Sequence, residues 1–77
     1  MDLNEFIDNV ADQFEDTDRS VFTADTNIWE LEDFTSLIAL SIISMIDEEY
    51  DVAIKGSDVK GLKTIAELYE VVKSKMD

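Results

Sequence analysis

The chain has 77 residues, contains neither cysteine nor histidine, and carries a formal net charge of −13 at pH 7. Without these two residue types it has no thiolate nucleophile, no disulfide, and no zinc site or Ser-His-Asp triad of the usual kinds. Its negative charge excludes binding to nucleic acid through phosphate contacts. An acidic surface attracts basic patches on other proteins, although it also serves simply to keep a small domain dissolved.

The length predicts one domain, residues 1–77, with a thin core and no room for a deep catalytic cleft, so we do not expect an enzyme. The first residues show no signal peptide. The longest apolar stretch, from Leu37 to Ile46, is interrupted by Ser41 and Ser44 and is too short to cross a membrane. We therefore expect a cytoplasmic monomer that does not contact membranes.

The first predicted helix runs from about Leu3 to Glu15, with Asp2 as its N-cap and Glu5 completing a capping box. Its apolar residues recur at helical spacing and form one stripe: Leu3, Phe6, Ile7, Val10 and Phe14.

A long connection from about Asp16 to Thr35 follows. It is rich in Asp and Thr, but its apolar residues predict a loop that packs onto the helices: Val21, Phe22, Ile28, Trp29 and Leu31. Residues 16–20 resemble the opening of a calcium loop. Because Val21 stands at the glycine position and Asn27 at the bidentate glutamate position, we expect no metal site there.

The second helix is predicted from Ser36 to about Tyr50, capped by Thr35 or Asp33. Residues placed at 100° intervals give a core face: Ala39, Ile42, Ile43, Ile46 and Tyr50. The opposite face holds Ser41, Ser44 and Glu48, with Leu37 in its middle and Ile38 and Met45 on its flank. Three apolar side chains on an otherwise polar face suggest a docking surface.

A short third helix is expected from Ser57 to Gly61, with Ser57 as its cap. The last helix begins after Thr64, which forms a capping box with Glu67. Its predicted buried stripe is Ile65, Leu68, Tyr69 and Val72. The predicted fold class is therefore all-α: a small four-helix bundle of three main helices and one short helix, with a long packed loop between the first two helices.

Ser36 is the most informative polar residue. A phosphate ester at the start of this helix would meet free backbone N–H groups and the positive end of the helix dipole. The residues alone nevertheless favour the plainer role of a helix-start serine, because such serines are common. The cluster Asp47–Glu49 is interpreted as solvated charge and not as a catalytic carboxylate pair.

Three segments resemble the acyl carrier protein family: residues 25–37, residues 47–52 and residues 63–68. The family shows D-S-L at the start of its second helix, an E-E-F/Y element ending fourteen residues after that serine, and a T-[IV] cap before its last helix. Here Ser36, Tyr50 and Thr64-Ile65 hold these positions, and the likeness covers nearly the whole chain.

The resemblance implies that a phosphopantetheinyl transferase attaches 4′-phosphopantetheine from coenzyme A to Ser36, making the chain a phosphoprotein. The thiol of this arm would hold an acyl or aminoacyl group as a thioester, placed there by a loading enzyme and used by downstream enzymes. A borrowed thiol fits the absence of cysteine. The carried chain is expected to fold back between the helices against apolar residues: Ile43, Ile46, Ile54, Val59 and Leu62.

The chain departs from the family at three positions. Thr35 replaces the usual Asp before the serine, and Ile38 and Ser41 replace acids that face the basic patches of fatty-acid synthase enzymes. These departures suggest dedicated partners in a specialised biosynthetic pathway in place of general fatty acid synthesis, with Asp33 as a substitute acid. The predicted partner-binding residues are Asp33, Leu37, Ile38, Ser41, Met45 and Glu48. The alternative is an unmodified acidic adaptor that binds a basic partner non-covalently.

Overall fold

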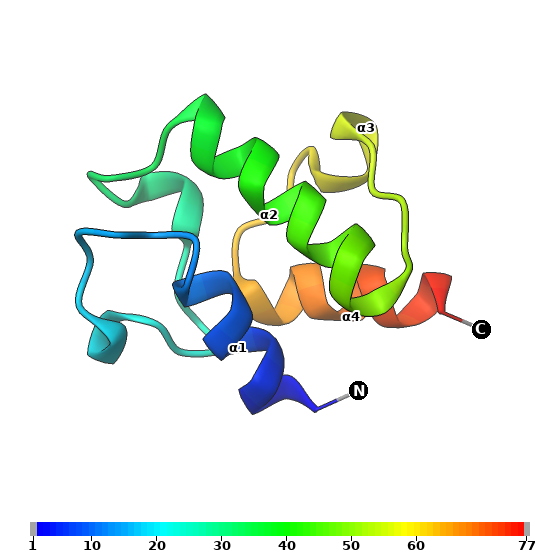
Figure 1. Cartoon of the computed structure of the whole chain (residues 1–77), viewed down its shortest axis with the longest axis horizontal. Helices are drawn as coiled ribbons and strands as arrows, with labels where there is room; N and C mark the ends of the chain where they lie inside the picture. Colours follow the sequence, from blue (N-terminus) through cyan, green and yellow to red (C-terminus); the bar gives the residue numbers. More distant parts are fainter. Residues whose placement is uncertain (1, 77) are drawn as a thin grey trace.

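The computed structural model describes residues 2–76, which form helices and connecting loops and contain no strand. The elements in chain order are α1 (Leu3–Ala11), the 3₁₀ helices η1 (Arg19–Val21) and η2 (Ile28–Glu30), α2 (Ser36–Tyr50), α3 (Gly56–Val59) and α4 (Ile65–Lys75). In Figure 1, α2 crosses the molecule above α1 and α4, the loop between α1 and α2 occupies the left side, and α3 lies at the upper right. The predicted all-α bundle is confirmed.

The core forms where the apolar stripes of α1, α2 and α4 meet. Phe6 and Val10 of α1, Ile46 of α2, and Ile65 and Val72 of α4 are all 0% exposed. Full burial of each such side chain contributes about 1.5–3 kcal/mol. The predicted stripes of α1 and α4 therefore supply much of the core. Buried residues from the segments between the α-helices complete it: Phe14, Phe22, Ile28, Val52 and Ile54.

The prediction that the first helix reaches Glu15 is wrong, because α1 ends at Ala11. The following turn tightens through two short-range bonds: the N–H of Gln13 donates to the carbonyl of Val10 at 3.1 Å, and the N–H of Phe14 to the carbonyl of Ala11 at 3.0 Å. The acids that follow Ala11 oppose the helix dipole, which favours an early end. Phe14 is still buried, packed against a loop phenylalanine.

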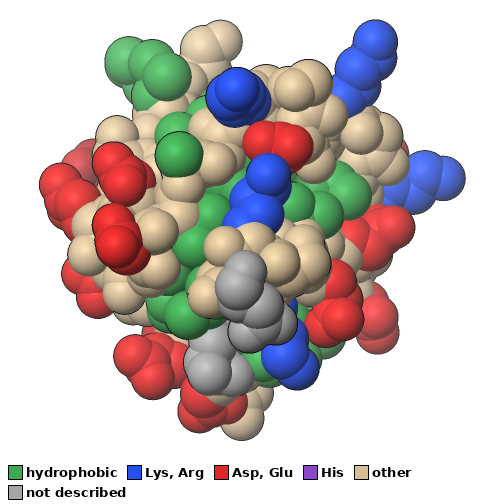
Figure 2. All heavy atoms as spheres, turned by 90° about the vertical axis from the view of Figure 1, so that its right-hand side faces the viewer, with side chains coloured by type: hydrophobic (Ala, Val, Ile, Leu, Met, Phe, Trp, Pro, Cys, Tyr) green, Lys and Arg blue, Asp and Glu red, His purple; other side chains and the backbone are tan. Residues whose placement is uncertain are grey.

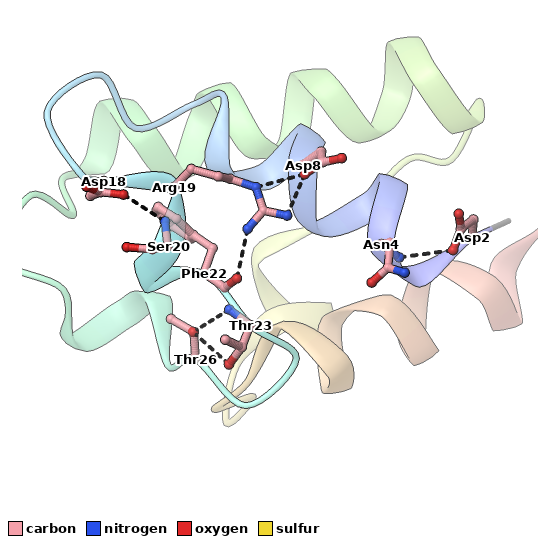
Figure 3. A network of polar contacts seen from close by, with 9 residues as sticks. All are labelled: Asp2, Asn4, Asp8, Asp18, Arg19, Ser20, Phe22, Thr23 and Thr26. Atoms are coloured by element: carbon pink, nitrogen blue, oxygen red, sulfur yellow. Dashed lines mark hydrogen bonds and ion pairs between the residues drawn. The ribbon is translucent and has the colours of Figure 1, made fainter.

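The long loop is ordered by Arg19, as Figure 3 shows. The guanidinium of Arg19 donates from Nε to Asp8 Oδ1 on α1 at 2.7 Å and from a second nitrogen to the carbonyl of Phe22 at 2.9 Å. Asp18, which precedes η1, accepts the N–H of Ser20 at 2.9 Å. This arginine is the one basic residue before residue 55, and it ties the loop to the first helix.

The same loop also contacts the start of α4. The N–H of Ile65 donates to the carbonyl of Thr26 at 3.1 Å, and the N–H of Ala66 to the carbonyl of Ala24 at 2.9 Å. The first N–H groups of a helix have no acceptor within the helix, so the loop satisfies two of them. The predicted packing of this loop onto the bundle is confirmed.

The starts of the later helices follow their capping residues. Thr35, and not Asp33, caps α2, since its Oγ1 accepts the N–H of Ile38 at 3.3 Å. The predicted Thr64 cap of α4 is confirmed. The third helix begins at Gly56, one residue earlier than predicted, with Lys55 in place of Ser57 at the N-cap position. The N–H of Lys55 donates to Asp58 Oδ2 at 2.9 Å, which fixes this earlier start.

The beginning of α1 and the end of α4 both lie away from the beginning of α2 (Figure 1). The helix α2 begins at the upper left of that view, beside the loop. The first residues of α1 lie at the bottom, and the last turn of α4 lies at the right. Among residues 2–76, no helix has both the length and the apolar character needed to cross a membrane.

Candidate phosphopantetheine site

Ser36 is the first residue of α2 and its side chain is exposed. Thr35 Oγ1 caps the N–H of Ile38, and the carbonyl of Thr35 accepts the N–H of Ala39 at 3.0 Å. The N–H groups of Ser36 and Leu37, at the very start of the helix, have no acceptor within it. A phosphate ester on the Ser36 hydroxyl would therefore lie beside unpaired donors at the positive end of a 15-residue helix.

An acidic groove borders this helix start. It is lined by four acids, together with other residues from the loop and from α2: Gln13, Glu15, Asp16, Glu32, Asp33, Thr35, Leu37, Ile38 and Ser41. Asp33 is half-buried, and one of its carboxylate oxygens accepts a hydrogen bond from the Thr17 hydroxyl. Since no lysine or arginine lines the groove, its negative charge is complementary to a basic surface on a partner.

The outer face of α2 exposes leucines among polar side chains. From Ser36 to Ile46 the helix carries no charged residue. Leu37 is 75% exposed and Leu40 is 60% exposed, and Ser41 and Glu48 on the same face are also exposed. Sequence reasoning missed Leu40, although it lies three positions after Leu37 and therefore on the same face.

The expectation that Met45 is part of this exposed face is wrong. Met45 is 7% exposed and belongs to the core. The side of α2 that carries Met45 is covered by α1, whose end contributes Asn9 and, just beyond it, Asp12 and Gln13 to the groove between the two helices. Helical spacing shows which residues share a face, but it does not show how far a neighbouring helix extends over that face.

Tyr50 joins the end of α2 to α1. Asn9 Nδ2 donates to the Tyr50 hydroxyl at 2.8 Å, and the rings of Tyr50 and Phe6 lie 5.7 Å apart. Burial raises the pKa of the Tyr50 hydroxyl, and the nearby carboxylates of Glu5 and Glu49 raise it further. This residue therefore holds the far end of α2 in place and lies at the opposite end of the helix from Ser36.

A small apolar cavity lies behind α2. Its volume is about 20 Å³, and its lining is Trp29, Ala39, Ile42, Ile43, Ile46, Ile54, Val59 and Leu68. A larger groove of about 310 Å³ adjoins it, lined by Trp29, Phe34, Ala39, Val59, Gly61 and Leu62. Of the five residues predicted to contact a carried chain, Leu62 lines the groove, Ile43, Ile46 and Ile54 line the cavity, and Val59 lines both.

Trp29 was predicted only as a packed loop residue, yet it lines both spaces. Its ring meets the edge of Phe34 at 5.2 Å with an interplanar angle of 89°. The position of Trp29 is set by η2, where Asn27 Oδ1 accepts the Trp29 N–H at 3.1 Å. That Asn before an apolar pair was a signal for a local turn, but nothing in the sequence indicates which helices the ring would meet.

A model of one protein family, described as the phosphopantetheine attachment site, matches residues 4–72. The chain belongs to this family. The resemblance to acyl carrier proteins is thereby confirmed, and the cofactor is 4′-phosphopantetheine, which the family carries in covalent linkage. Carrier domains of this kind are not themselves catalytic. A search of curated proteins gave no match, and neither did a search of solved structures.

The residues of this phosphopantetheine-attachment domain fit the cofactor. An exposed hydroxyl at a helix start suits a phosphate ester, and an apolar groove beside the same helix suits a flexible arm and its cargo. When bound, the arm supplies a thiol, which the chain itself lacks. Across residues 2–76, no group of three or more acids is arranged to hold a metal ion.

Proposed function

We propose that Ser36 is the attachment point and that the chain carries an acyl or aminoacyl group as a thioester on the arm. The observation that carries this proposal is the exposed Ser36 hydroxyl at the start of α2, inside the matched segment. In the transfer from coenzyme A, the serine oxygen forms the new bond to phosphorus and the pyrophosphate bond breaks, releasing the adenosine part. We assign the base that accepts the serine proton to the transferase.

The residues around Ser36 supply order and charge stabilisation. Thr35 holds the first turn of α2 through its cap, which places the Ser36 hydroxyl on a rigid element. The unpaired N–H groups of Ser36 and Leu37 favour the phosphate ester once it has formed. No further chemistry is required of this chain, in keeping with a carrier that presents its cargo to other enzymes.

We also propose that the partners dock on the outer face of α2. The exposed leucines Leu37 and Leu40 would enter an apolar socket, with Ile38 and Ser41 at its edge. Asp33 and Glu48 lie toward the two ends of this surface, where a partner's lysines or arginines would meet them. A partner built for the acidic second helix of a fatty-acid carrier would not match this neutral centre, so we favour dedicated loading and downstream enzymes of a specialised cytoplasmic pathway.

The test is intact mass spectrometry after incubation with coenzyme A, Mg²⁺ and a promiscuous phosphopantetheinyl transferase. We expect the wild type to gain one phosphopantetheine and Ser36→Ala to gain none. Ser57→Ala is the matched control, because Ser57 is also an exposed serine at a helix start, and it should gain the full mass. Thr35→Asp restores the family's usual acid and should be modified at least as fast as the wild type.

If no transferase modified either the wild type or Thr35→Asp, the carrier proposal would fail. The unmodified adaptor, which binds a basic partner through the same acidic surface, would then be the better explanation. If Ser36→Ala still gained the mass, the arm would be attached elsewhere. Only the loss of modification in Ser36→Ala, with Ser57→Ala unaffected, supports the assignment.

A further inference from the structure

Trp29 contains a buried polar atom without a partner. Its indole Nε1 has an exposed area below 1 Å² and forms no hydrogen bond within the described part of the chain. A buried donor without an acceptor is destabilising, and such donors are rare in folded proteins. Trp29 lies at a place where a ligand can arrive, because its side chain lines both the apolar cavity and the groove that adjoins it.

A trapped water is a poor explanation for this donor. The cavity has a volume of about 20 Å³, which is close to the space of one water molecule. A buried water needs two to four polar partners, but every other residue that lines the cavity has an apolar side chain. A molecule that enters between α2 and α3 could supply the missing acceptor.

We propose that the carried group supplies this acceptor, so that the cargo bears an oxygen, such as a keto, hydroxyl or amide oxygen, that bonds to the indole N–H of Trp29. This inference rests on the proposed carrier function. The route from Ser36 is short: Ala39 lines both spaces three residues later, and Ile43 and Ile46 continue along the same helix. At about 1.5 Å per residue, these positions span roughly 15 Å of α2.

Trp29 would thus act as a specificity-determining residue. A saturated chain and an oxygenated chain of equal length fill similar space, but only the oxygenated chain pairs the buried donor. The pairing removes the penalty of the unsatisfied N–H in addition to adding a hydrogen bond. Since the cavity is too small for a chain without movement of its walls, the ring of Trp29, at the boundary of the two spaces, would shift as the cargo enters.

The single tryptophan gives one indole N–H signal in a ¹H–¹⁵N correlation spectrum. We would compare four forms: unmodified, phosphopantetheine alone, a saturated acyl chain, and a 3-oxoacyl chain of the same length. The expected result is a downfield indole shift and a roughly two- to tenfold slower N–H exchange in the 3-oxoacyl form alone. An equal change in the form with phosphopantetheine alone would assign the acceptor to the arm and overturn the proposal. No change in any form would also overturn it.

A second experiment makes this test independent of the transferase. Because the chain has no cysteine, Ser36→Cys offers one thiol, to which saturated and oxo-substituted alkyl chains of graded length can be joined as disulfides. If the enzymatic loading failed, the proposed function would be in doubt, while the disulfide series would still decide whether an oxygen pairs with Trp29. Intact mass reports loading, and the indole signal reports pairing, so the two failures are distinguishable.

Trp29→Phe supplies the matched variant, since it keeps an aromatic ring and removes the donor. In the wild type we expect the oxo-substituted form to melt at a higher temperature than the saturated form of equal length. In Trp29→Phe this difference in Tm should vanish, while both loaded forms remain folded. A difference in Tm that persists in Trp29→Phe would show that the cargo oxygen is recognised by another group.

Discussion

The carboxylate of Glu67 accepts hydrogen bonds from two backbone N–H groups at the start of α4. Its Oε1 accepts the N–H of Lys63 at 2.8 Å and that of Thr64 at 2.9 Å, while Thr64 Oγ1 accepts the N–H of Glu67 at 3.1 Å. The two bonds to backbone N–H groups favour the ionised form, so the pKa of Glu67 lies below its usual value of 4.5.

This lowered pKa makes stability depend on pH. Because the folded-state pKa is below the unfolded one, the contribution of Glu67 is present above about pH 4.5 and is lost as the pH falls through the folded pKa. We expect the Tm of the wild type to fall further between about pH 5 and pH 3 than that of Glu67→Gln, which keeps an acceptor but binds no proton. Glu70→Gln, an exposed position on the same helix, is the control and should follow the wild type. Equal pH profiles for Glu67→Gln and the wild type would contradict this role.

At the scale of the element, α2 divides into a buried and an exposed apolar side. Met45 is 7% exposed and Leu40 is 60% exposed, although the two side chains have similar helix propensity. Met45→Ala should lower the free energy of unfolding by about 2–5 kcal/mol, and Leu40→Ala by less than about 1 kcal/mol. Urea unfolding of the two variants measures this contrast.

For partner binding, we expect Leu40 to matter more than Met45. Leu40→Ala, still folded, should reduce the kcat/KM of the transferase or of a loading enzyme, because it removes an exposed leucine from the proposed surface. A Leu40→Ala variant that was modified and loaded at the wild-type rate would remove this residue from the partner-binding surface. A loss of stability as large as that of Met45→Ala would show that Leu40 is buried.

The predicted bounds of α2, from Ser36 to Tyr50, are those of the structure, since Thr35 is a strong cap and the apolar spacing is regular. The predicted end of the first helix failed because a periodic stripe does not distinguish a full turn of helix from a tighter turn that buries the same Phe14. The predicted exposure of Met45 was wrong for a related reason: how far α1 extends over α2 depends on tertiary packing.

The candidate site shows a similar division. Ser36 stays a prediction, and it could be proposed because motif spacing is local. Four of the five predicted cargo contacts line the cavity, because an apolar pattern shows which residues turn toward the core. Trp29 was missed as a site residue because its partners, Ala39 of α2 and Val59 of α3, are distant along the chain. Residues whose role depends on loop packing are those that sequence patterns place least well.

At the scale of the whole molecule, charge is unevenly distributed. Residues 1–54 hold fifteen acids and one arginine, whereas residues 55–77 hold four acids and five lysines. On the face shown in Figure 2, basic side chains lie over the centre, the top and the right edge, and most acidic side chains lie at the left, the bottom and the lower right. The helix that supplies most of the proposed docking surface, α2, belongs to the acidic part of the chain. The lysines lie in α4, on either side of α3 and just before α4.

This imbalance predicts how salt affects stability. The molecule measures 33 × 23 × 22 Å, and the screening length is about 30 Å at 0.01 M salt but about 3 Å at 1 M. At low salt nearly all acids therefore repel one another across the fold. We expect the Tm to rise when NaCl is increased from about 10 mM to 500 mM, and to rise less in Glu48→Gln/Glu49→Gln. A Tm that fell with salt would instead show that ion pairs such as Asp8–Arg19 dominate.

The chain enters and leaves the bundle on the sides away from the start of α2 (Figure 1). If the arm is attached at Ser36 as proposed, a tether joined before α1 or after α4 would lie away from it. With Ser36 as the attachment point, either end of the chain could be joined to a support or to a neighbouring module while the start of α2 stays accessible. For display on beads or for tandem fusion, the permitted attachment points are therefore its two termini.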